Sequence, residues 1–287
     1  MSVRADDHEN TGIDLSALSD GLVEVEPGFW TAGESEAVVS YPSDGHKATR
    51  ELEEFSFWYR HRNSCIAEVV RHLPPGGPIV EIGAGNGFVA LGLEREGLRV
   101  IALEPGPEGA RHARERGLAP VVQSTLEDSR FHPGSLAACA MFDVLEHIED
   151  DTQFLRKVRR LLRPSGRIYI TVPAQPWLWS ADDVRAGHHR RYTTRSLSSA
   201  LESAGYRTEY MSAFFAALVV PVLLRRALPT RLGLRRGQLR DRQIREHESG
   251  SGRMTRIVDA TLRREQRRLI RRPRTIGTSL VAAATVD

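Results

Sequence analysis

The stretch IVEIGAGNGF, residues 79–88, places three glycines directly after a short apolar run. Gly83, Gly85 and Gly87 lack a Cβ atom, so the backbone there can adopt positive φ angles and approach a ligand closely. The residues that follow are typical of a helix, whose first N–H groups have no partner within the helix. A strand, a glycine loop and a helix in this order indicate a ligand site where the helix begins.

Two carboxylates accompany the glycine loop. Glu81 directly precedes it, where a carboxylate would repel a pyrophosphate and suit a cation. Glu104 ends the next apolar stretch, and its two oxygens can accept hydrogen bonds from both hydroxyls of a ribose. The dinucleotide motif GxGxxG needs a glycine where this chain has Phe88, which argues against a nicotinamide cofactor.

Helix-like and strand-like segments alternate along the chain, which is typical of a parallel sheet covered by helices. The run LAACAMF, residues 136–142, is uninterrupted by polar residues, as expected of a central strand buried on both faces. The pattern predicts helices over 53–73, 86–97, 107–117, 151–162 and 194–205. It predicts strands over 78–83, 98–104, 119–123, 136–142, 167–173, 206–214 and 278–286.

The charge is distributed unevenly. The chain of 287 residues has a net charge of +3, yet the segment from Arg225 to Arg274 holds 17 arginines, no lysine and five acidic residues. Part of this segment has an apolar stripe at helical spacing, which predicts an amphipathic helix packed on the body. The stripe consists of Met254, Ile257, Val258, Thr261, Leu262 and Leu269.

Cysteine content and hydropathy limit the class of protein. Cys65 and Cys139 show no metal-ligand spacing and cannot form a disulfide framework, so we expect buried thiols and a cytoplasmic location. The first twelve residues contain no apolar signal sequence. The longest apolar run, 213–224, is interrupted by Pro221 and is too short to span a bilayer.

Five segments appear in a fixed order: VEIGAGNG, ALEP, STLED, FDVLEHIEDD and LLRPSGRIYITVP. In this order the chain resembles class I S-adenosylmethionine-dependent methyltransferases, in particular those of ubiquinone and secondary-metabolite synthesis. The resemblance covers roughly residues 53–213 and the closing strand. It implies an α/β, Rossmann-like seven-stranded sheet of order 3-2-1-4-5-7-6 with the last strand antiparallel. It also implies a helical N-terminal lid, with the basic helical insertion placed before the last strand.

The resemblance divides the chain and assigns a cofactor site. The expected parts are a lead-in over 1–52, a cofactor-binding core over 53–213, a basic cover over 214–276 and a final strand over 277–287. S-adenosylmethionine is the expected cofactor, with its ribose on Glu104. The residues that the resemblance places around it are Trp58, Tyr59, Arg62, Glu81, Gly83, Ala84, Gly85, Gly87, Glu104, Pro105, Thr125, Leu126, Phe142 and Asp143.

Methyl transfer to a hydroxyl or ammonium group requires a base that accepts a proton. His147, in the motif DVLEH, is the first candidate, and His188 or His189 is the second. Asp143 lies beside the expected reacting methyl group. In ubiquinone methyltransferases, which resemble this chain here, a similar carboxylate and Glu-His cluster holds a divalent ion. Glu-His is also common in members without one, so we expect no metal.

The segment DDVRAGHHRRYT, residues 182–193, follows the fifth strand and is expected to form a loop at the carboxyl edge of the sheet. It resembles a pattern in bacterial small-molecule methyltransferases. The two tryptophans just before it are expected to wall an apolar acceptor pocket. The predicted substrate residues are Trp177, Trp179, Asp183, His188, Arg191 and Tyr192.

Alternatives remain open at this point. The arginine-rich segment is interpreted as a substrate cover, with lipid contact through 213–240, a homodimer contact and nucleic-acid binding as alternatives. We expect a small-molecule acceptor and no nucleic acid, because aromatic interleaving and known RNA-binding motifs are absent from the sequence. The function alternatives are a nicotinamide-dependent oxidoreductase and a non-catalytic S-adenosylmethionine-binding partner subunit.

Overall fold

Alternating side chains in the central strands explain the layers of this computed structural model. In β6 (Leu136–Phe142), Cys139 and Met141 pack on one face of the sheet, and Ala138, Ala140 and Phe142 pack on the other. Both sets are buried, which accounts for the uninterrupted apolar run. The structure describes the chain apart from residues 1–11, 33–49, 51, 54–55 and 234–252.

Nine strands of the described chain form one sheet in the order β1-β2-β5-β4-β3-β6-β7-β9-β8. The seven predicted strands occupy seven consecutive positions, and β9 is antiparallel to both of its neighbours. Numbered along the chain, these seven follow the order 3-2-1-4-5-7-6. The strands are β1 (Val23–Glu26), β2 (Phe29–Thr31), β3 (Ile79–Ile82), β4 (Val100–Leu103), β5 (Val121–Gln123), β6, β7 (Leu162–Pro173), β8 (Arg207–Phe214) and β9 (Ser279–Thr285).

Two strands that the sequence pattern did not predict, β1 and β2, lie within the expected lead-in over 1–52. Phe29 and Trp30 of β2 pair in parallel with Val121 and Val122 of β5, which extends the sheet at that edge. Both strands are short, and their side chains are exposed in β1 and half-buried in β2. They therefore show little of the apolar periodicity from which strands are predicted.

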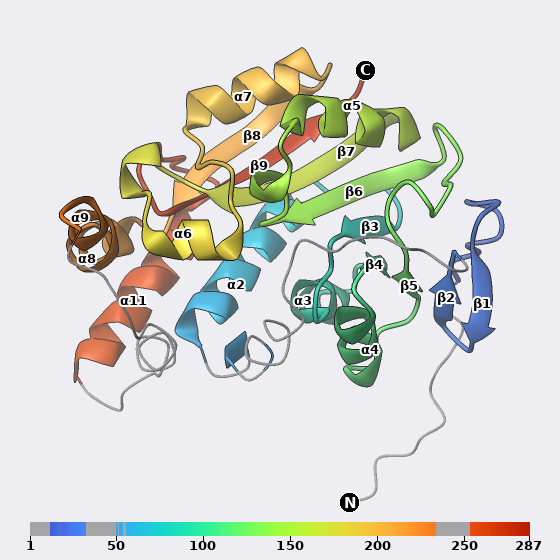
Figure 1. Ribbon diagram of the computed structural model, residues 1–287, viewed down its shortest axis with the longest axis horizontal. Coiled ribbons are helices and arrows are strands. Elements are labelled where there is room, and N and C mark those ends of the chain that lie inside the picture. Colours follow the sequence, from blue (N-terminus) through green and yellow to red (C-terminus); the bar gives the residue numbers. More distant parts are fainter. Residues whose placement is uncertain (1–11, 33–49, 51, 54–55, 234–252) are drawn as a thin grey trace, which may run out of the picture.

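Helices cover both faces of the sheet (Figure 1). One face packs against α5 and α7, and the opposite face packs against α2, α3, α4 and α11. The helices of these two layers are α2 (Phe57–His72), α3 (Phe88–Arg95), α4 (Pro107–Glu115), α5 (Asp151–Leu161), α7 (Thr194–Ser203) and α11 (Arg253–Arg268).

Short helical segments follow β6, β7 and β8 at their carboxyl ends. The predicted loop over 182–193 is corrected in part, because Asp182 and Asp183 lie in a helix whose start is capped by Ser180. The segments are η1 (Leu145–His147), η2 (Pro176–Leu178), α6 (Ala181–Ala186), η3 (Ala216–Leu218), α8 (Val219–Val222), η4 (Leu223–Ala227) and α9 (Leu228–Arg231).

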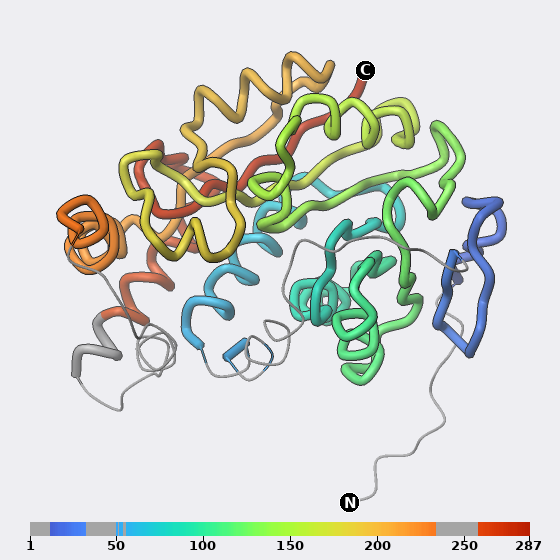
Figure 2. The backbone as a smooth tube through the Cα atoms, viewed as in Figure 1, coloured from blue at the N-terminus to red at the C-terminus, as the bar shows by residue number. Residues whose placement is uncertain are grey.

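Part of the basic insertion forms helices that return to the body of the molecule. We call residues 216–232, which comprise η3, α8, η4, α9 and Leu232, the cover helix; it lies at one end of the molecule near α11 (Figure 2). The predicted amphipathic helix is present as α11; its Leu262 is buried, and so is Leu269, directly after its end. The side chains of Met254 and Ile257 lie outside the described residues, as do 234–240 of the proposed lipid-contact segment.

Candidate active site

A cavity of ≈ 720 Å³ opens at the carboxyl ends of β3, β4 and β6. This is where parallel α/β sheets place their ligands, and the volume suits a small organic ligand. Its wall also includes residues of α2 and of the cover helix. The predicted residues that line it are Trp58, Tyr59, Arg62, Glu81, Gly83, Ala84, Gly85, Glu104, Pro105, Thr125, Leu126, Phe142, Asp143, His147, His188 and Arg191.

The glycine loop is held against the end of β4. The backbone N–H groups of Gly83 and Ala84 both donate to the carbonyl of Leu103, at 2.8 and 3.0 Å. Gly85 has a φ of 55°, in the left-handed region that glycine adopts readily. A Cβ built on Gly85 meets nothing within 4 Å, so this position faces open space. The loop therefore presents bare backbone to the cavity.

Glu104 is bound to the same loop through both oxygens. Its Oε2 accepts the N–H of Gly85 at 2.7 Å, and its Oε1 accepts the N–H of Gly106 at 2.8 Å. Glu104 is thus buried and held in a fixed orientation beside the loop, where its carboxylate lines the cavity.

Glu81 is a buried carboxylate that lines the cavity. Its Oε2 has no hydrogen-bond partner among the described residues. Burial raises the pKa of Glu81 to about 8, with Arg62 opposing the shift and the charges of Glu104 and Glu53 adding to it. A positively charged ligand group would satisfy the orphaned oxygen and lower this pKa.

Helix α2 forms the wall facing the loop. Ser56 caps its start, and the side chains of Trp58, Tyr59 and Arg62 then reach the cavity. The Arg62 Nε lies 2.6 Å from Asp143 Oδ2, an ion pair that joins α2 to the end of β6. Arg62 Nε makes no hydrogen bond within the described residues, so the contact is chiefly Coulombic. Asp143 itself has a φ of 58°, an unusual value for a residue that is not glycine.

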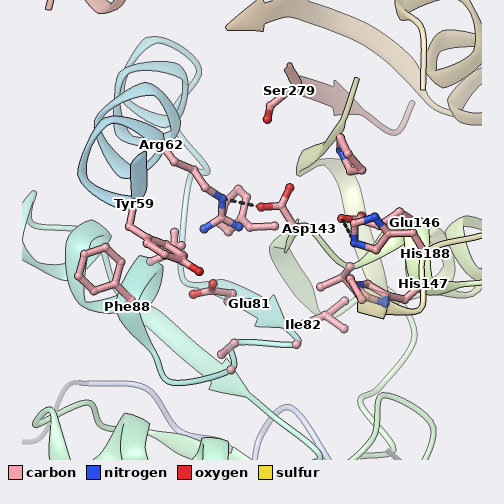
Figure 3. Close-up of a pocket in the computed structure, with 18 of the residues that line it drawn as sticks. Tyr59, Arg62, Glu81, Ile82, Phe88, Asp143, Glu146, His147, His188 and Ser279 are labelled. Carbon is pink, nitrogen blue, oxygen red and sulfur yellow. Dashed lines mark ion pairs between the residues drawn. The ribbon is translucent and has the colours of Figure 1, made fainter. Parts of the chain in front are cut away.

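Three side chains that could accept a proton or bind a metal ion lie on the wall of the cavity opposite α2 (Figure 3). One ligand atom each of Glu146, His147 and His188 lie within 4.8 Å of one another. The His147 and His188 rings meet edge to face, with centroids 4.8 Å apart. Burial, followed by the nearby His188, lowers the pKa of His147 to about 4, so His147 is neutral near pH 7. A neutral imidazole can accept a proton or bind a cation.

Glu146 is fully buried in this cluster, and neither of its oxygens accepts a hydrogen bond from the described residues. Burial, and then the charge of Asp143, raises its pKa well above the usual range. His188 Nε2 lies 3.9 Å from Glu146 Oε1. The position of Glu146 between two histidines permits a divalent cation, although the sequence prediction was that no metal binds.

His188 is oriented by a buried ion-pair network. Its Nδ1 lies 3.1 Å from Asp183 Oδ1, which also accepts the Nε of Arg191 at 2.8 Å. Although burial alone would raise it, the hydrogen bonds from His188 and Arg191 lower the pKa of Asp183 to about 2. The second oxygen of Asp183 accepts the N–H of Ser180 and caps α6. Asp183 is therefore ionised and acts through His188 and Arg191.

The hydroxyl of Thr125 is already engaged. It donates to Asp128 Oδ2 at 2.8 Å and accepts the N–H of Asp128 at 3.0 Å. Leu126, the next residue, is buried and lines the cavity. These positions follow the end of β5, whose parallel neighbour β4 is followed directly by Glu104.

Several predicted residues do not line the cavity, which corrects their expected positions. Gly87 packs against Ala113 of α4 and Leu118, where a Cβ would come within 2.3 Å of Leu118 Cδ1. His189 is exposed and Asp183 is buried in α6. Three more predicted residues lie outside the cavity. The indole of Trp177 donates to Gln175 Oε1, and Trp179 is half-buried after η2. The hydroxyl of Tyr192 donates to Asp151 Oδ2 at 2.8 Å.

The cavity is also lined by residues that were not among the predicted site residues. Ser279 lies at the start of β9, almost at the end of the chain, and Phe88 meets Tyr59 edge to face at 6.1 Å. Phe88 could have been found from its position directly after the glycine loop. The cover helix supplies Leu218, Pro221, Val222, Arg225 and Arg226.

A family model for the methyltransferase domain matches residues 57–210, more than half of the chain. Among curated proteins, a probable S-adenosylmethionine-dependent methyltransferase of Mycolicibacterium smegmatis is 26% identical over 171 residues, or 58% of this chain and 66% of the relative. A ubiquinone biosynthesis O-methyltransferase of Sodalis glossinidius is 31% identical over 42% of this chain and 51% of the relative. The chain thus spans less than two thirds of these relatives.

Solved structures support the fold. A phosphoethanolamine N-methyltransferase of Haemonchus contortus in complex with S-adenosyl-L-methionine is 16% identical, with a TM-score of 0.55 over 88% of this chain and 61% of that one. A SAM-dependent methyltransferase of Thermotoga maritima is 17% identical, with a TM-score of 0.52 over 84% of this chain and 98% of that one. These likenesses concern architecture alone. Together with the family model, the geometry leads to one assignment: the chain belongs to the methyltransferase domain family.

Proposed function

We propose that this chain transfers a methyl group from S-adenosylmethionine to an oxygen or nitrogen atom of a small molecule. The single observation that carries the proposal is the unpaired, buried oxygen of Glu81 beside a carboxylate, Glu104, that is bound to a glycine loop. This pairing fits a ligand with an ammonium group at one end and a ribose further along. The family match supports it over a nicotinamide cofactor.

The cavity residues fit this cofactor in chemical character. Glu81 would receive the ammonium group, because its free oxygen and raised pKa both favour a neighbouring cation. Glu104 would accept the ribose hydroxyls, and the open space at Gly85 leaves room for the ligand beside the backbone. Leu126 offers an apolar contact for the base, beside a Thr125 hydroxyl already bonded to Asp128.

When bound, S-adenosylmethionine supplies an electrophilic methyl group on sulfur. The residues of this chain would hold the acceptor in line with it and exclude water. Neutral His147 would take the proton that an acceptor hydroxyl or ammonium group loses. His188, fixed by Asp183, would keep the His147 ring in place through their edge-to-face contact. The Arg62–Asp143 ion pair would close the cavity between α2 and β6.

The acceptor would enter beside α2 and the cover helix, the proposed lid and cover of the site. Leu218, Pro221 and Val222 provide an apolar surface there, and Arg225 and Arg226 provide positive charge. This combination supports a secondary metabolite, a quinone-like compound or a lipid-linked molecule as acceptor.

Calorimetric titration tests the cofactor assignment. We expect S-adenosylmethionine and S-adenosylhomocysteine to bind while NAD does not. Binding of NAD alone would overturn the proposal in favour of the oxidoreductase alternative.

Release of S-adenosylhomocysteine with a panel of phenols, amines and polyprenyl compounds then tests catalysis. We expect release with at least one acceptor class and its loss in His147→Ala. Cofactor binding with no release from any acceptor would favour the non-catalytic partner-subunit alternative.

A further inference from the structure

The outer face of the cover helix carries an exposed apolar stripe. Val220, Leu224, Leu228 and Leu232 follow one another at intervals of four residues, and their exposed fractions are 61%, 56%, 40% and 61%. Side chains four residues apart lie on the same side of a helix. Exposed leucines in a row along one helix face are typical of a contact surface.

The stripe is exposed because of how the helix is seated. Val219 and Ala227 are buried, and the side of the helix facing the body lines the cavity. The buried carboxylate of Glu265 accepts the N–H groups of Phe215 and Ala216 at 2.8 and 2.9 Å, which fixes the start of the helix to α11. The apolar stripe therefore projects from a well-anchored element.

Arginines flank the stripe. Arg225 and Arg231 are exposed on the same helix, and Arg231 donates to the carbonyl of Trp177 at 2.6 Å. Helix α11 contacts η3, at the start of the cover helix, and lies at the same end of the molecule (Figure 1). Its exposed face adds Arg263, Arg264, Arg267 and Arg268. This end of the molecule therefore carries exposed positive charge on both helices.

We propose that the cover helix binds the surface of an anionic lipid bilayer, with Val220, Leu224, Leu228 and Leu232 in the interface and the flanking arginines on lipid phosphates. Amphipathic helices with apolar and basic faces bind membranes in this way. No described helix is long and apolar enough to cross a bilayer, so the contact would be at the surface.

Charge favours this occupant over a second copy of the chain. A two-fold interface would bring the same arginines of both copies close together, where like charges repel. Anionic headgroups instead complement them. The proposal goes beyond the proposed function, because membrane binding requires neither the cofactor nor turnover. It also places Arg225, which lines the cavity, next to the bilayer.

Sedimentation with vesicles tests the proposal. The full chain is mixed with vesicles of phosphatidylcholine alone or with phosphatidylglycerol added. We expect binding to the anionic vesicles, little binding to phosphatidylcholine, and release at high salt. The double variant Leu224→Glu/Leu228→Glu should lower the bound fraction by about five-fold or more, because two charges replace the apolar contact.

Val23→Glu/Val25→Glu is the matched control. These valines are 62% and 52% exposed on β1, at the opposite edge of the sheet, and this variant should bind like the wild type. Both pairs are on the surface, and the thermal midpoint and S-adenosylhomocysteine affinity of each variant report its folding. Failure of the wild type to sediment, or equal loss in both pairs, would overturn the proposal. Loss of a dimer in Leu224→Glu/Leu228→Glu without lipid would identify a second copy as the occupant and also overturn it.

Discussion

The two ends of the cavity are built in different ways. At the cofactor end, the glycine loop and Glu104 come from segments close in sequence, and backbone hydrogen bonds join them directly. At the proposed acceptor end, contacts with distant segments hold the cover helix: Glu265 of α11 accepts the N–H groups at its start, and Arg231 near its end donates to the carbonyl of Trp177. The first end is determined by local backbone geometry and the second by contacts between distant segments.

The difference indicates which end of the cavity tolerates substitution. The glycine loop offers backbone and two carboxylates to a ligand, with little freedom to vary. The acceptor wall is made of apolar and arginine side chains on a helix that could change without disturbing the loop. We therefore expect substitutions at the two ends to affect different measurements.

The largest expected effect is on turnover, at the junction between the ends. His147→Ala should lower kcat by about 10²–10⁴-fold, the range for loss of a general base, while the Kd for S-adenosylhomocysteine stays unchanged. Because the pKa of His147 is about 4, wild-type kcat should not fall until the pH approaches that value. Exposed His189 gives the control, and His189→Ala should keep full turnover. Unchanged kcat in His147→Ala would remove it as the base.

Two glycines of the loop separate stability from ligand binding. In Gly87→Ala, with φ of 73°, the new Cβ would lie 2.3 Å from Leu118 Cδ1 and 2.9 Å from Ala113 Cβ. We expect a loss of about 2–5 kcal/mol in the free energy of unfolding, measured by denaturant titration, from strain and overpacking together. Gly85→Ala adds a Cβ in open space and should cost only about 1–2 kcal/mol, from its φ of 55°.

For ligand affinity we expect the opposite ranking of these two variants: Gly85→Ala should lose more affinity than Gly87→Ala. The methyl group of Gly85→Ala projects toward the cavity, so its Kd for S-adenosylhomocysteine should rise more than that of Gly87→Ala at a temperature where both are folded. Equal stability losses in the two variants would contradict the distinction between a packed and an open glycine.

The anchor of the acceptor end depends on pH. Burial alone would raise the pKa of Glu265, but hydrogen bonds from His61 and from the N–H groups of Ala216 and Phe215 lower it. A carboxyl whose pKa is lower in the folded state stabilises the fold above its unfolded pKa, and this is lost as the pH falls through the folded value. Glu265→Gln should therefore cost about 1–3 kcal/mol at neutral pH. The deficit relative to the wild type should shrink in acid, and a deficit independent of pH would contradict this account.

The smallest expected effect concerns the ribose site. Glu104→Gln keeps the shape of the side chain but removes its charge and one of its two acceptor oxygens. We expect S-adenosylhomocysteine binding to weaken by about 1–2 kcal/mol, measured by calorimetry. Glu96→Gln, at the end of α3, provides a control of the same chemistry outside the cavity, and its affinity should match the wild type. An equal effect in both would show that Glu104 does not touch the ligand.

The same contrast explains what could be predicted. The seven core strands and the position of the glycine loop beside the cavity were predictable because strand periodicity and the glycine loop are local patterns that extend over adjacent residues. Arg225 and Ser279 could not be placed, since their approach to the cavity depends on how the insertion returns to α2. Trp177 was misplaced for a related reason: its indole N–H is taken by Gln175, which a linear pattern cannot reveal. Strands β1 and β2 were missed because they are short, with β1 exposed and β2 only half-buried.

The central claim is that the nucleoside of S-adenosylmethionine lies along the glycine loop with its ribose on Glu104. A crystal structure of the chain with S-adenosylhomocysteine tests it most directly. The account predicts both ribose hydroxyls within hydrogen-bond distance of the Glu104 carboxylate and the ammonium group beside Glu81 Oε2. A ligand bound elsewhere, or a ribose turned away from Glu104, would contradict it.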